Sequence, residues 1–268
     1  MKLIISLAQM NVVSGDLEGN LEKGSCFIAE AKKRHSHLIV FPELWTTGFN
    51  WSFNHKIIEE HKKVIPHIAK LAKLHQIWIH GSVLAENEEK KMSNTSILFT
   101  PLGQENALYR KTHLFSLLGE EKHMAPGKCL TLAKTPWGKS GLSICYDIRF
   151  PELFRSYALE GAKIIFSPAA FPHPRLEHWK ILLRARAIEN QLFMVGVNQV
   201  GKGEIYKGKQ ISFFGHSAII DPWGNTVIEG SENNEELLTT EIDMDIVDSI
   251  RKEMTVFNDR RPEIYTAI

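Results

Sequence analysis

The chain has 268 residues, of which 43% are hydrophobic and 24% charged, a composition typical of a globular protein that buries a substantial core. Its formal net charge of +1 gives no reason to expect nucleic acid or an anionic membrane surface as a partner. No apolar run approaches the roughly 18 residues that are needed to cross a membrane.

The first residues favour a β-strand over a secretion signal. They contain one lysine and an apolar stretch, but Gln9 and Asn11 interrupt that stretch and no small-residue cleavage site follows. The three cysteines, Cys26, Cys129 and Cys145, are an odd and sparse set, which favours reduced thiols. We therefore expect a cytoplasmic protein.

The first half of the chain alternates strands and helices. In chain order the pattern predicts a strand over 3–10, a helix over 20–34, a strand over 37–43, a helix over 61–75 and strands over 77–86 and 94–103. Pro66 either bends the helix over 61–75 or marks its late start. The mixed charge run over 86–91 is interpreted as a solvated hairpin tip.

The second half continues the alternation. The pattern predicts a strand over 139–147, a helix over 151–162, strands over 163–170 and 192–200 around a helix over 178–191, a hairpin over 215–230, a strand over 237–243 and a last helix over 244–253. The helix over 151–162 has proline at its first turn, and the hairpin turns at a Pro-Trp-Gly-Asn sequence. There is no repeat or linker, so we expect one domain over residues 1–268.

Repeated β-α-β units predict an α/β fold in which helices cover a sheet. In such folds ligands lie beyond the carboxyl ends of the strands. Three positions fit: Glu43 after one apolar run, Cys145 after another, and the segment 167–171 after a third.

Cys145 is the first candidate for chemistry. A lone cysteine is usually a small core residue. Here it ends a predicted strand and precedes a polar pair and a helix that starts with proline. A sharp turn at that point would expose the sulfur and direct the next backbone N–H groups at a bound molecule, and a helix N-terminus would lower the thiol pKa. Cys26 and Cys129 lack this context.

Glu43 and Lys111 are candidate partners of the thiol. Glu43 follows an apolar run, where an ionised carboxylate is costly unless it is paired, although a surface-facing glutamate fits as well. Lys111 is flanked by apolar residues, so it either extends its ammonium to solvent or lies beside Glu43 and Cys145, where it would favour a thiolate and hold an oxyanion.

Spacings typical of metal and nucleotide sites are absent from the sequence. There is no Cys-x-x-Cys or His-Glu-x-x-His, and no Gly-x-Gly-x-x-Gly follows the first strand. His173 and His178 have no convincing third ligand beside them. We therefore expect no metal and no cofactor.

Taken together, the segments "FPELWTTGF", "YRKTHLF" and "ICYDIRFPEL", with "RARAIENQ" and "GHSAIIDPWG" after them, resemble the carbon–nitrogen hydrolase family of the nitrilase superfamily. The resemblance spans nearly the whole chain. It implies a four-layer α-β-β-α sandwich and a homodimer formed through helices beside the active site. It also implies a Glu–Lys–Cys triad, which corresponds here to Glu43, Lys111 and Cys145.

The resemblance implies further site residues. A second glutamate follows the lysine in the family; counting back from "APG" favours Glu120, and the adjacent Glu121 stays open. This carboxylate would orient Lys111, and the backbone N–H of Tyr146 would share the oxyanion with it.

Within the superfamily the chain looks most like the omega-amidases, which hydrolyse the terminal amide of dicarboxylic monoamides such as 2-oxoglutaramate and succinamate. Such a substrate needs a cation for its far carboxylate, and arginine suits bidentate binding. The candidate substrate-binding residues are Arg149, Phe171, Arg175 and His178. Arg149 equally fits a structural ion pair with Asp147 or Glu152, and the segment "FPHPRLEHW" departs from mammalian-type members.

Three other hypotheses stay open at this point. A nitrilase would use the same triad on a carbon–nitrogen triple bond, and an N-carbamoyl amino acid amidohydrolase would release carbon dioxide together with ammonia. A non-catalytic member would keep the fold as a scaffold, although the intact Glu43, Lys111 and Cys145 count against it.

Overall fold

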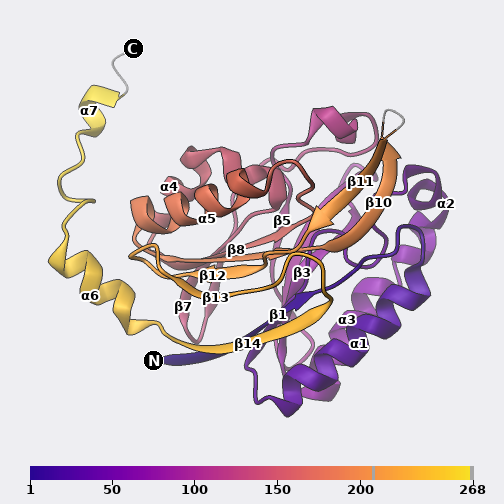
Figure 1. Cartoon of the computed structure of the whole chain (residues 1–268), viewed down its shortest axis with the longest axis horizontal. Coiled ribbons are helices and arrows are strands. Elements are labelled where there is room, and N and C mark those ends of the chain that lie inside the picture. Colours follow the sequence, from indigo (N-terminus) through magenta and orange to yellow (C-terminus); the bar gives the residue numbers. More distant parts are fainter. Residues whose placement is uncertain (207–208, 266–268) are drawn as a thin grey trace.

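The computed structural model describes residues 1–206 and 209–265, whose strands form two six-stranded sheets and a two-stranded ribbon (Figure 1). The first sheet has the order β14 (Glu236–Asp243), β1 (Lys2–Gln9), β2 (Leu38–Val40), β3 (Trp78–Glu86), β4 (Met92–Phe99) and β5 (Glu105–Arg110). The second has the order β13 (Thr226–Glu229), β12 (Ala218–Ile220), β9 (Phe193–Asn198), β8 (Ala162–Ala169), β7 (Gly138–Leu142) and β6 (Leu132–Thr135). The ribbon pairs β10 (Val200–Tyr206) with β11 (Lys209–Phe214).

Parallel strands lie at the centre of each sheet. β1, β2 and β3 are parallel in the first sheet, and β7, β8 and β9 are parallel in the second. The remaining pairs within the two sheets are antiparallel. Central parallel strands are buried on both faces, which accounts for the continuous apolar runs in the sequence. Their carboxyl ends meet at one edge of the molecule.

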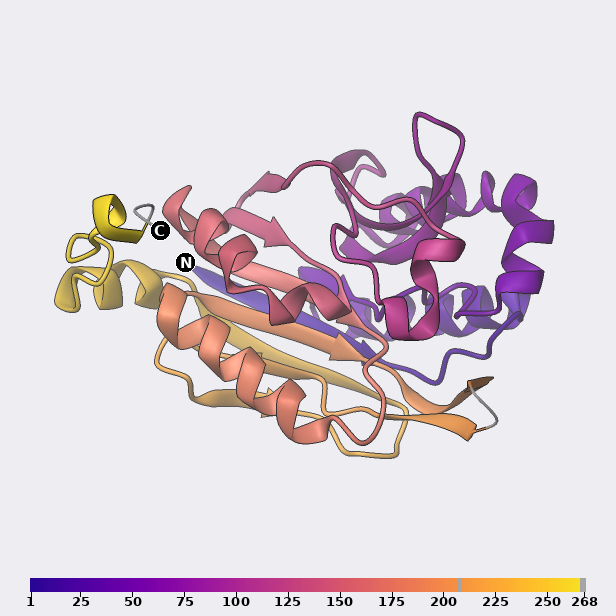
Figure 2. The same ribbon diagram turned by 90° about the horizontal axis from the view of Figure 1, so that it is seen from above.

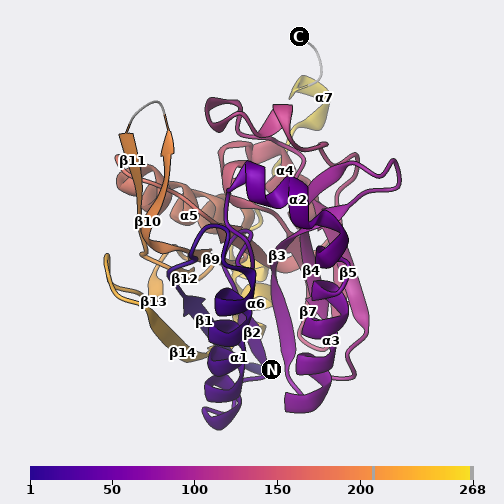
Figure 3. The same ribbon diagram turned by 90° about the vertical axis from the view of Figure 1, so that its right-hand side faces the viewer.

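Helices cover the outer face of each sheet. α1 (Leu17–Lys33) and α3 (Val64–His75) lie on the first sheet, and α4 (Pro151–Leu159) and α5 (Leu176–Asn190) lie on the second (Figures 1 and 3). Ile28 of α1, Ile68 of α3 and Ile79 of β3 belong to one buried hydrophobic cluster between these helices and the first sheet. The expectation of a four-layer α-β-β-α sandwich is therefore confirmed.

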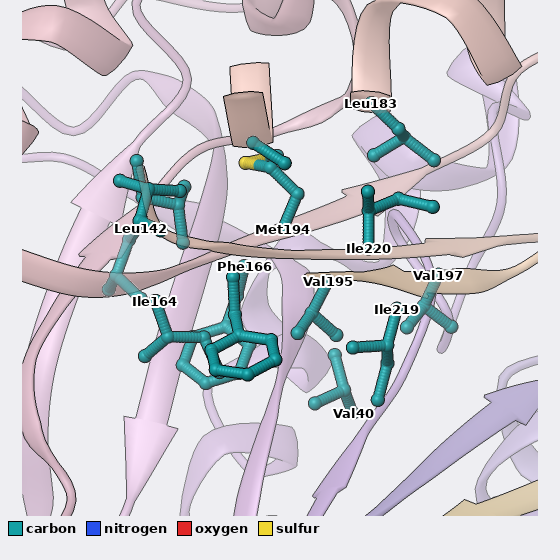
Figure 4. Close-up of a cluster of buried hydrophobic side chains, with 14 of the residues drawn as sticks. Val40, Leu142, Ile164, Phe166, Leu183, Met194, Val195, Val197, Ile219 and Ile220 are labelled. Carbon is teal, nitrogen blue, oxygen red and sulfur yellow. The ribbon is translucent and has the colours of Figure 1, made fainter. Parts of the chain in front are cut away.

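The two sheets meet through side chains that alternate along each strand (Figure 4). Val195 and Ile219 of the second sheet point toward Val40 of the first. Met194 and Ile220, one position along, point to the other face, where Leu183 of α5 lies. This alternation explains why these strands carry apolar residues at successive positions.

Several predicted boundaries were wrong at the edge where the site lies. The strand predicted over 139–147 ends at Leu142, and Cys145–Arg149 form a 3₁₀ helix, η3. The strand predicted over 37–43 is reduced to Leu38–Val40. Both strands stop early because the chain must turn there to bring polar side chains to the sheet edge.

The late start of the helix around Pro66 is confirmed. α3 begins at Val64, which places Pro66 in its first turn, where a backbone N–H has no intrahelical partner. The charge run over 86–91 forms the exposed turn between β3 and β4, as expected. The sequence pattern did not indicate α2 (Trp51–His61), the β10–β11 ribbon or α7 (Pro262–Tyr265).

The C-terminal segment lies at one end of the sheets, where Met244 and Val247 are buried in the core. α6 (Asp245–Glu253) matches the predicted last helix, and α7 follows it at the far side of the molecule from the β10–β11 ribbon (Figures 1 and 2). In the part of the chain that the structure describes, no helix is both long and apolar enough to span a membrane. Cys26, Cys129 and Cys145 are all free thiols, the first two exposed and the third buried.

Candidate active site

The three candidate residues meet at the carboxyl-end edge of the sheets. Glu43 follows β2, Lys111 follows β5 and Cys145 follows β7. All three line one pocket, together with Glu120. Each side chain is buried, Glu43 and Lys111 almost completely. The structure thus brings together residues that are separated by up to about a hundred positions in the sequence.

Lys111 lies between two buried carboxylates. Its Nζ is 2.7 Å from Oε1 of Glu43 and 2.8 Å from Oε1 of Glu120. Burial alone lowers the pKa of Lys111, but the charges of Glu120, Glu43 and Cys145 outweigh it and raise that pKa above its ordinary value. The Lys111 side chain is therefore a permanent cation in this pocket.

Glu120, rather than its neighbour, is the carboxylate at Lys111. A short 3₁₀ segment, η1 (Ser116–Leu118) followed by η2 (Glu120–Lys122), turns Glu120 inward and leaves Glu121 exposed. The backbone N–H of Phe115 donates to Oε2 of Glu120 at 2.8 Å. Burial raises the pKa of Glu120, and the Lys111 charge opposes that shift.

Glu43 is fixed by groups from three other segments. Nδ2 of Asn94 in β4 donates to Oε1 at 2.8 Å, and the backbone N–H of Ala170 donates to Oε2 at 3.0 Å. Nε2 of Gln199 donates to the Glu43 carbonyl oxygen at 2.8 Å. Since Lys111 also donates to Oε1, the orientation of the carboxylate is determined before any ligand arrives.

Cys145 has a backbone conformation that is uncommon for a non-glycine residue, with φ of 47°. This turn follows the end of β7 and places the thiol in the same pocket as the Glu43 carboxylate. The expected lowering of its pKa by a helix N-terminus was wrong for this environment. Burial and the Glu43 charge raise the pKa of Cys145 well above its ordinary value, against the opposing charge of Lys111.

Asp147 holds the Cys145 turn against the segment that carries Lys111. Its carboxylate accepts from the backbone N–H of Ile144 at 2.8 Å and from the Tyr109 hydroxyl at 2.8 Å. The backbone N–H of His113 also donates to it at 3.1 Å, and His113 Nδ1 is 2.8 Å away. Because these contacts occupy its carboxylate, Asp147 has a structural role: it acts as a clamp that links the turn at Cys145 to the segment at Lys111.

The predicted substrate-binding residues surround the thiol, with one exception. Arg149, Phe171 and Arg175 line the pocket with Cys145, together with Tyr146. The Arg149 guanidinium carbon is 5.3 Å from the Phe171 ring centre, and that of Arg175 is 5.6 Å from the Phe115 ring centre.

His178 lies one contact away from the pocket. Its Nδ1 is 3.2 Å from Nη2 of Arg149, so it contacts the arginine and not the cavity. The structural alternative for Arg149 was an ion pair with Asp147 or Glu152. Neither pair forms in the described part of the chain: Asp147 binds Tyr109 and His113 instead, and the contact of the Arg149 guanidinium is His178.

Sequence reasoning missed Asn94, Gln199 and the clamp formed by Asp147. Asn94 lies in a strand whose other residues are equally buried, so no local pattern distinguishes it. Gln199 falls near the end of the predicted apolar strand over 192–200 and reaches Glu43 only through the tertiary fold. Asp147 stands two positions after Cys145, and that proximity was the one available signal. Among the described residues, no group of three or more histidine, cysteine or acidic side chains could hold a metal ion.

Comparisons with known proteins agree with this geometry. Residues 4–252 match the model of the carbon–nitrogen hydrolase family. The chain is 36% identical to a 2-oxoglutaramate amidase of Bacillus subtilis, covering 99% of this chain and 100% of that protein, and 30% identical to an omega-amidase of Xenopus tropicalis, covering 99% and 97%.

A solved structure supports the same assignment. The fold matches a branch 10 member of the nitrilase superfamily from Saccharomyces cerevisiae with a TM-score of 0.85, at 29% identity over 97% of each chain. Together with the family match, this similarity covers both sheets and the pocket between their edges. The chain therefore belongs to the carbon–nitrogen hydrolase family, within the nitrilase superfamily.

Proposed function

We propose that this protein hydrolyses the terminal amide of a small dicarboxylic monoamide, such as 2-oxoglutaramate or succinamate, to the dicarboxylic acid and ammonia. The names of the two full-length relatives support this substrate class. The observation that carries the reaction type is the contact of Lys111 with both Glu43 and Glu120 beside a buried thiol.

In this proposal Glu43 is the general base for Cys145. The carboxylate takes the thiol proton as the sulfur attacks the amide carbon, so that no free thiolate has to persist in the buried pocket. The raised pKa of Cys145 supports such coupled transfer, because burial and the Glu43 charge keep the thiol protonated until a substrate is present. Glu43 then returns the proton to the nitrogen, and ammonia leaves.

Lys111 and the backbone N–H of Tyr146 hold the oxyanion of the tetrahedral intermediate. An ammonium has three donors, and Glu43 and Glu120 accept two of those of Lys111, which leaves a third for the oxyanion. Tyr146 is the second residue of η3, where backbone N–H groups have no intrahelical partner. Loss of one such donor typically costs about 10²–10³ in rate.

The thioester left on Cys145 is hydrolysed in the second half of the reaction. Glu43 takes a proton from water, the hydroxide adds to the thioester carbon, and collapse of this intermediate expels the sulfur. The proton on Glu43 returns to Cys145, and the acid leaves. One carboxylate serves both half-reactions because Asn94 and the Ala170 N–H keep it in the same place throughout.

Arg149 and Arg175 are the proposed partners of the far carboxylate of the substrate. Both line the pocket and both lie against aromatic rings, which limits their motion. Phe171 forms a wall of that pocket, and His178 positions Arg149 from behind. In this arrangement the guanidinium groups of Arg149 and Arg175, which select an acidic substrate, line the same pocket as the Cys145 thiol.

We also propose that residues 1–268 act as one domain, as a homodimer, in the cytoplasm. Ile181 and Ile188 of α5 support the dimer, since both are large apolar side chains that are more than half exposed. Size-exclusion chromatography with light scattering tests it. A mass of one chain, 30.5 kDa, across the micromolar range would contradict the dimer.

The test of the function is ammonia release from succinamate and 2-oxoglutaramate, compared with propionamide, a simple nitrile and an N-carbamoyl amino acid. We expect turnover of the two monoamides, and none by Cys145→Ala. Turnover of the nitrile alone would make the protein a nitrilase. Carbon dioxide release from the carbamoyl compound would make it an N-carbamoyl amidohydrolase, and inactivity on all five would favour a scaffold.

A further inference from the structure

A second cavity adjoins the catalytic pocket. It shares Phe49, Leu118 and Ala170 with that pocket and has a volume of about 440 Å³. Cavities of roughly 300–1,000 Å³ typically hold drug-sized ligands. The catalytic pocket alone has a volume of about 20 Å³, so an acyl chain that extends beyond the reacting amide and does not turn toward Arg149 or Arg175 enters the second cavity.

Three segments enclose the second cavity. They are the start of α2, the η1–η2 segment and the β10–β11 ribbon, which lie at the same end of the molecule (Figures 1 and 3). Trp51, Ile211 and Phe213 give it apolar walls, and Phe49 and Leu118 continue those walls into the catalytic pocket. A methylene chain that leaves the catalytic pocket through this passage would stay in contact with apolar side chains.

The ionisable groups that line the second cavity are basic. Lys122 and His123 line it, and no aspartate or glutamate is among its described lining residues. The His123 ring stacks on Trp51 with centres 4.7 Å apart, and its Nδ1 lies 3.1 Å from Nε2 of His55, which leaves Nε2 for a ligand. Burial, then His55 and Lys122, lower the pKa of His123, so Lys122 supplies the charge and His123 a neutral hydrogen bond.

We propose that the second cavity is a subsite for the distal carboxylate of longer dicarboxylic monoamides, with Lys122 and His123 as its anion-binding groups. The inference rests on the proposed function, since it concerns the far end of the same acyl group. Short monoamides bind their carboxylate at Arg149 or Arg175. Longer ones pass Phe49 and Leu118, place their methylenes between the apolar walls and reach Lys122.

The test is a chain-length series of ω-monoamides from succinamate to the eight-carbon suberamate, with neutral alkyl amides of the same lengths. We expect kcat/KM to fall beyond the short monoamides and then to rise at the longer ones. The rise should be up to roughly fourfold for each methylene that enters the second cavity. The neutral amides should have lower kcat/KM values than the monoamides of equal length, because they lack the distal carboxylate.

Lys122→Gln isolates the charge. We expect it to lower the ratio of kcat/KM for suberamate to that for octanamide about tenfold, the scale of a hydrogen bond to a charged group. The matched control is Lys134→Gln, an exposed lysine on β6, which should leave that ratio within about twofold of the wild-type value.

The outcomes separate this inference from the proposed function. Turnover of succinamate with a steady decline along the series, or an equal ratio in Lys122→Gln and Lys134→Gln, overturns the subsite and leaves the amidase assignment intact. Inactivity on every monoamide overturns the amidase assignment and the subsite with it. Both proposals are supported if kcat/KM rises again toward suberamate and if Lys122→Gln lowers the ratio of kcat/KM for suberamate to that for octanamide.

Discussion

Asn94 donates its side-chain hydrogen bond to the same Glu43 oxygen, Oε1, that accepts one from Lys111. Its backbone carbonyl also accepts from the Lys111 N–H at 2.9 Å, where the chain leaves β5. One residue of β4 therefore sets the position of the proposed base and of the cation beside it. The relationship gives Asn94 a role that its place in a uniformly buried strand does not reveal.

We expect Asn94→Ala to lower kcat about 10- to 100-fold with little change in KM, because a hydrogen bond to a charged group is lost at the reacting centre and none at the substrate. Steady-state kinetics on succinamate measures this. Asn106→Ala, which removes a side-chain hydrogen bond on neighbouring β5, is the control. An unchanged kcat in Asn94→Ala would show that Lys111 and Ala170 are sufficient to hold Glu43.

Glu120 and Glu121 offer a matched pair of substitutions. Glu120→Gln removes one of the two carboxylates at Lys111, so we expect kcat/KM to fall about a hundredfold, the scale of a displaced oxyanion donor. Glu121→Gln changes an exposed side chain, and we expect a value within twofold of wild type. Equal effects of the two substitutions on kcat/KM would show that Glu120 has no specific role in catalysis.

The raised pKa of Cys145 makes its labelling by a small thiol reagent pH-dependent. At pH 7 the thiol form dominates, so methyl methanethiosulfonate should modify Cys145 more slowly than the exposed Cys26 and Cys129. The rate for Cys145 should still be rising above pH 9.0, the ordinary cysteine pKa, because its own pKa lies above that value. Peptide mapping by mass spectrometry measures each site.

The Glu43 charge is one cause of that raised pKa, so Glu43→Gln should move the rate profile of Cys145 to lower pH. The profiles of Cys26 and Cys129 serve as internal references in the same sample. Faster modification of Cys145 than of both exposed cysteines at pH 7 would contradict a protonated resting thiol.

Burial of the neutral His80 side chain should make the free energy of unfolding decrease as the pH is lowered. The side chain is buried between the sheets, with Nε2 2.7 Å from the Ser96 hydroxyl, and burial lowers the pKa of His80 to about 3 from its ordinary 6.5. Between these two pH values the unfolded chain binds a proton that the folded chain does not. Lowering the pH therefore favours unfolding, by up to about 1.4 kcal/mol per pH unit.

Urea unfolding from pH 6.5 to 4 tests this dependence. We expect the free energy of unfolding to fall less steeply with decreasing pH in His80→Gln than in the wild type. The difference should correspond to about one proton. His67→Gln changes an exposed histidine and should keep the wild-type slope. If the free energy of unfolding falls equally steeply with decreasing pH in all three proteins, groups other than His80 cause the acid dependence.

The sequence by itself determined the order of strands and helices and the location of the site, whereas the four layers followed from the resemblance to the carbon–nitrogen hydrolase family. Period-2 and continuous apolar runs mark strands such as β1 and β8, and helical periods mark α1 and α5, because local burial patterns follow the geometry of each element. Polar residues directly after apolar runs, Glu43 and Cys145 among them, mark the sheet edge, since the carboxyl ends of parallel strands meet there.

Only the tertiary structure decided which side chains touch. The turn of η2 selects Glu120 over Glu121, although the two are neighbours in the chain. Asn94, Gln199 and Asp147 reach their partners from distant segments, and burial together with the Glu43 charge reverses the expected direction of the Cys145 pKa shift. Contacts and electrostatic fields depend on distances in space, and no local pattern of residues encodes them.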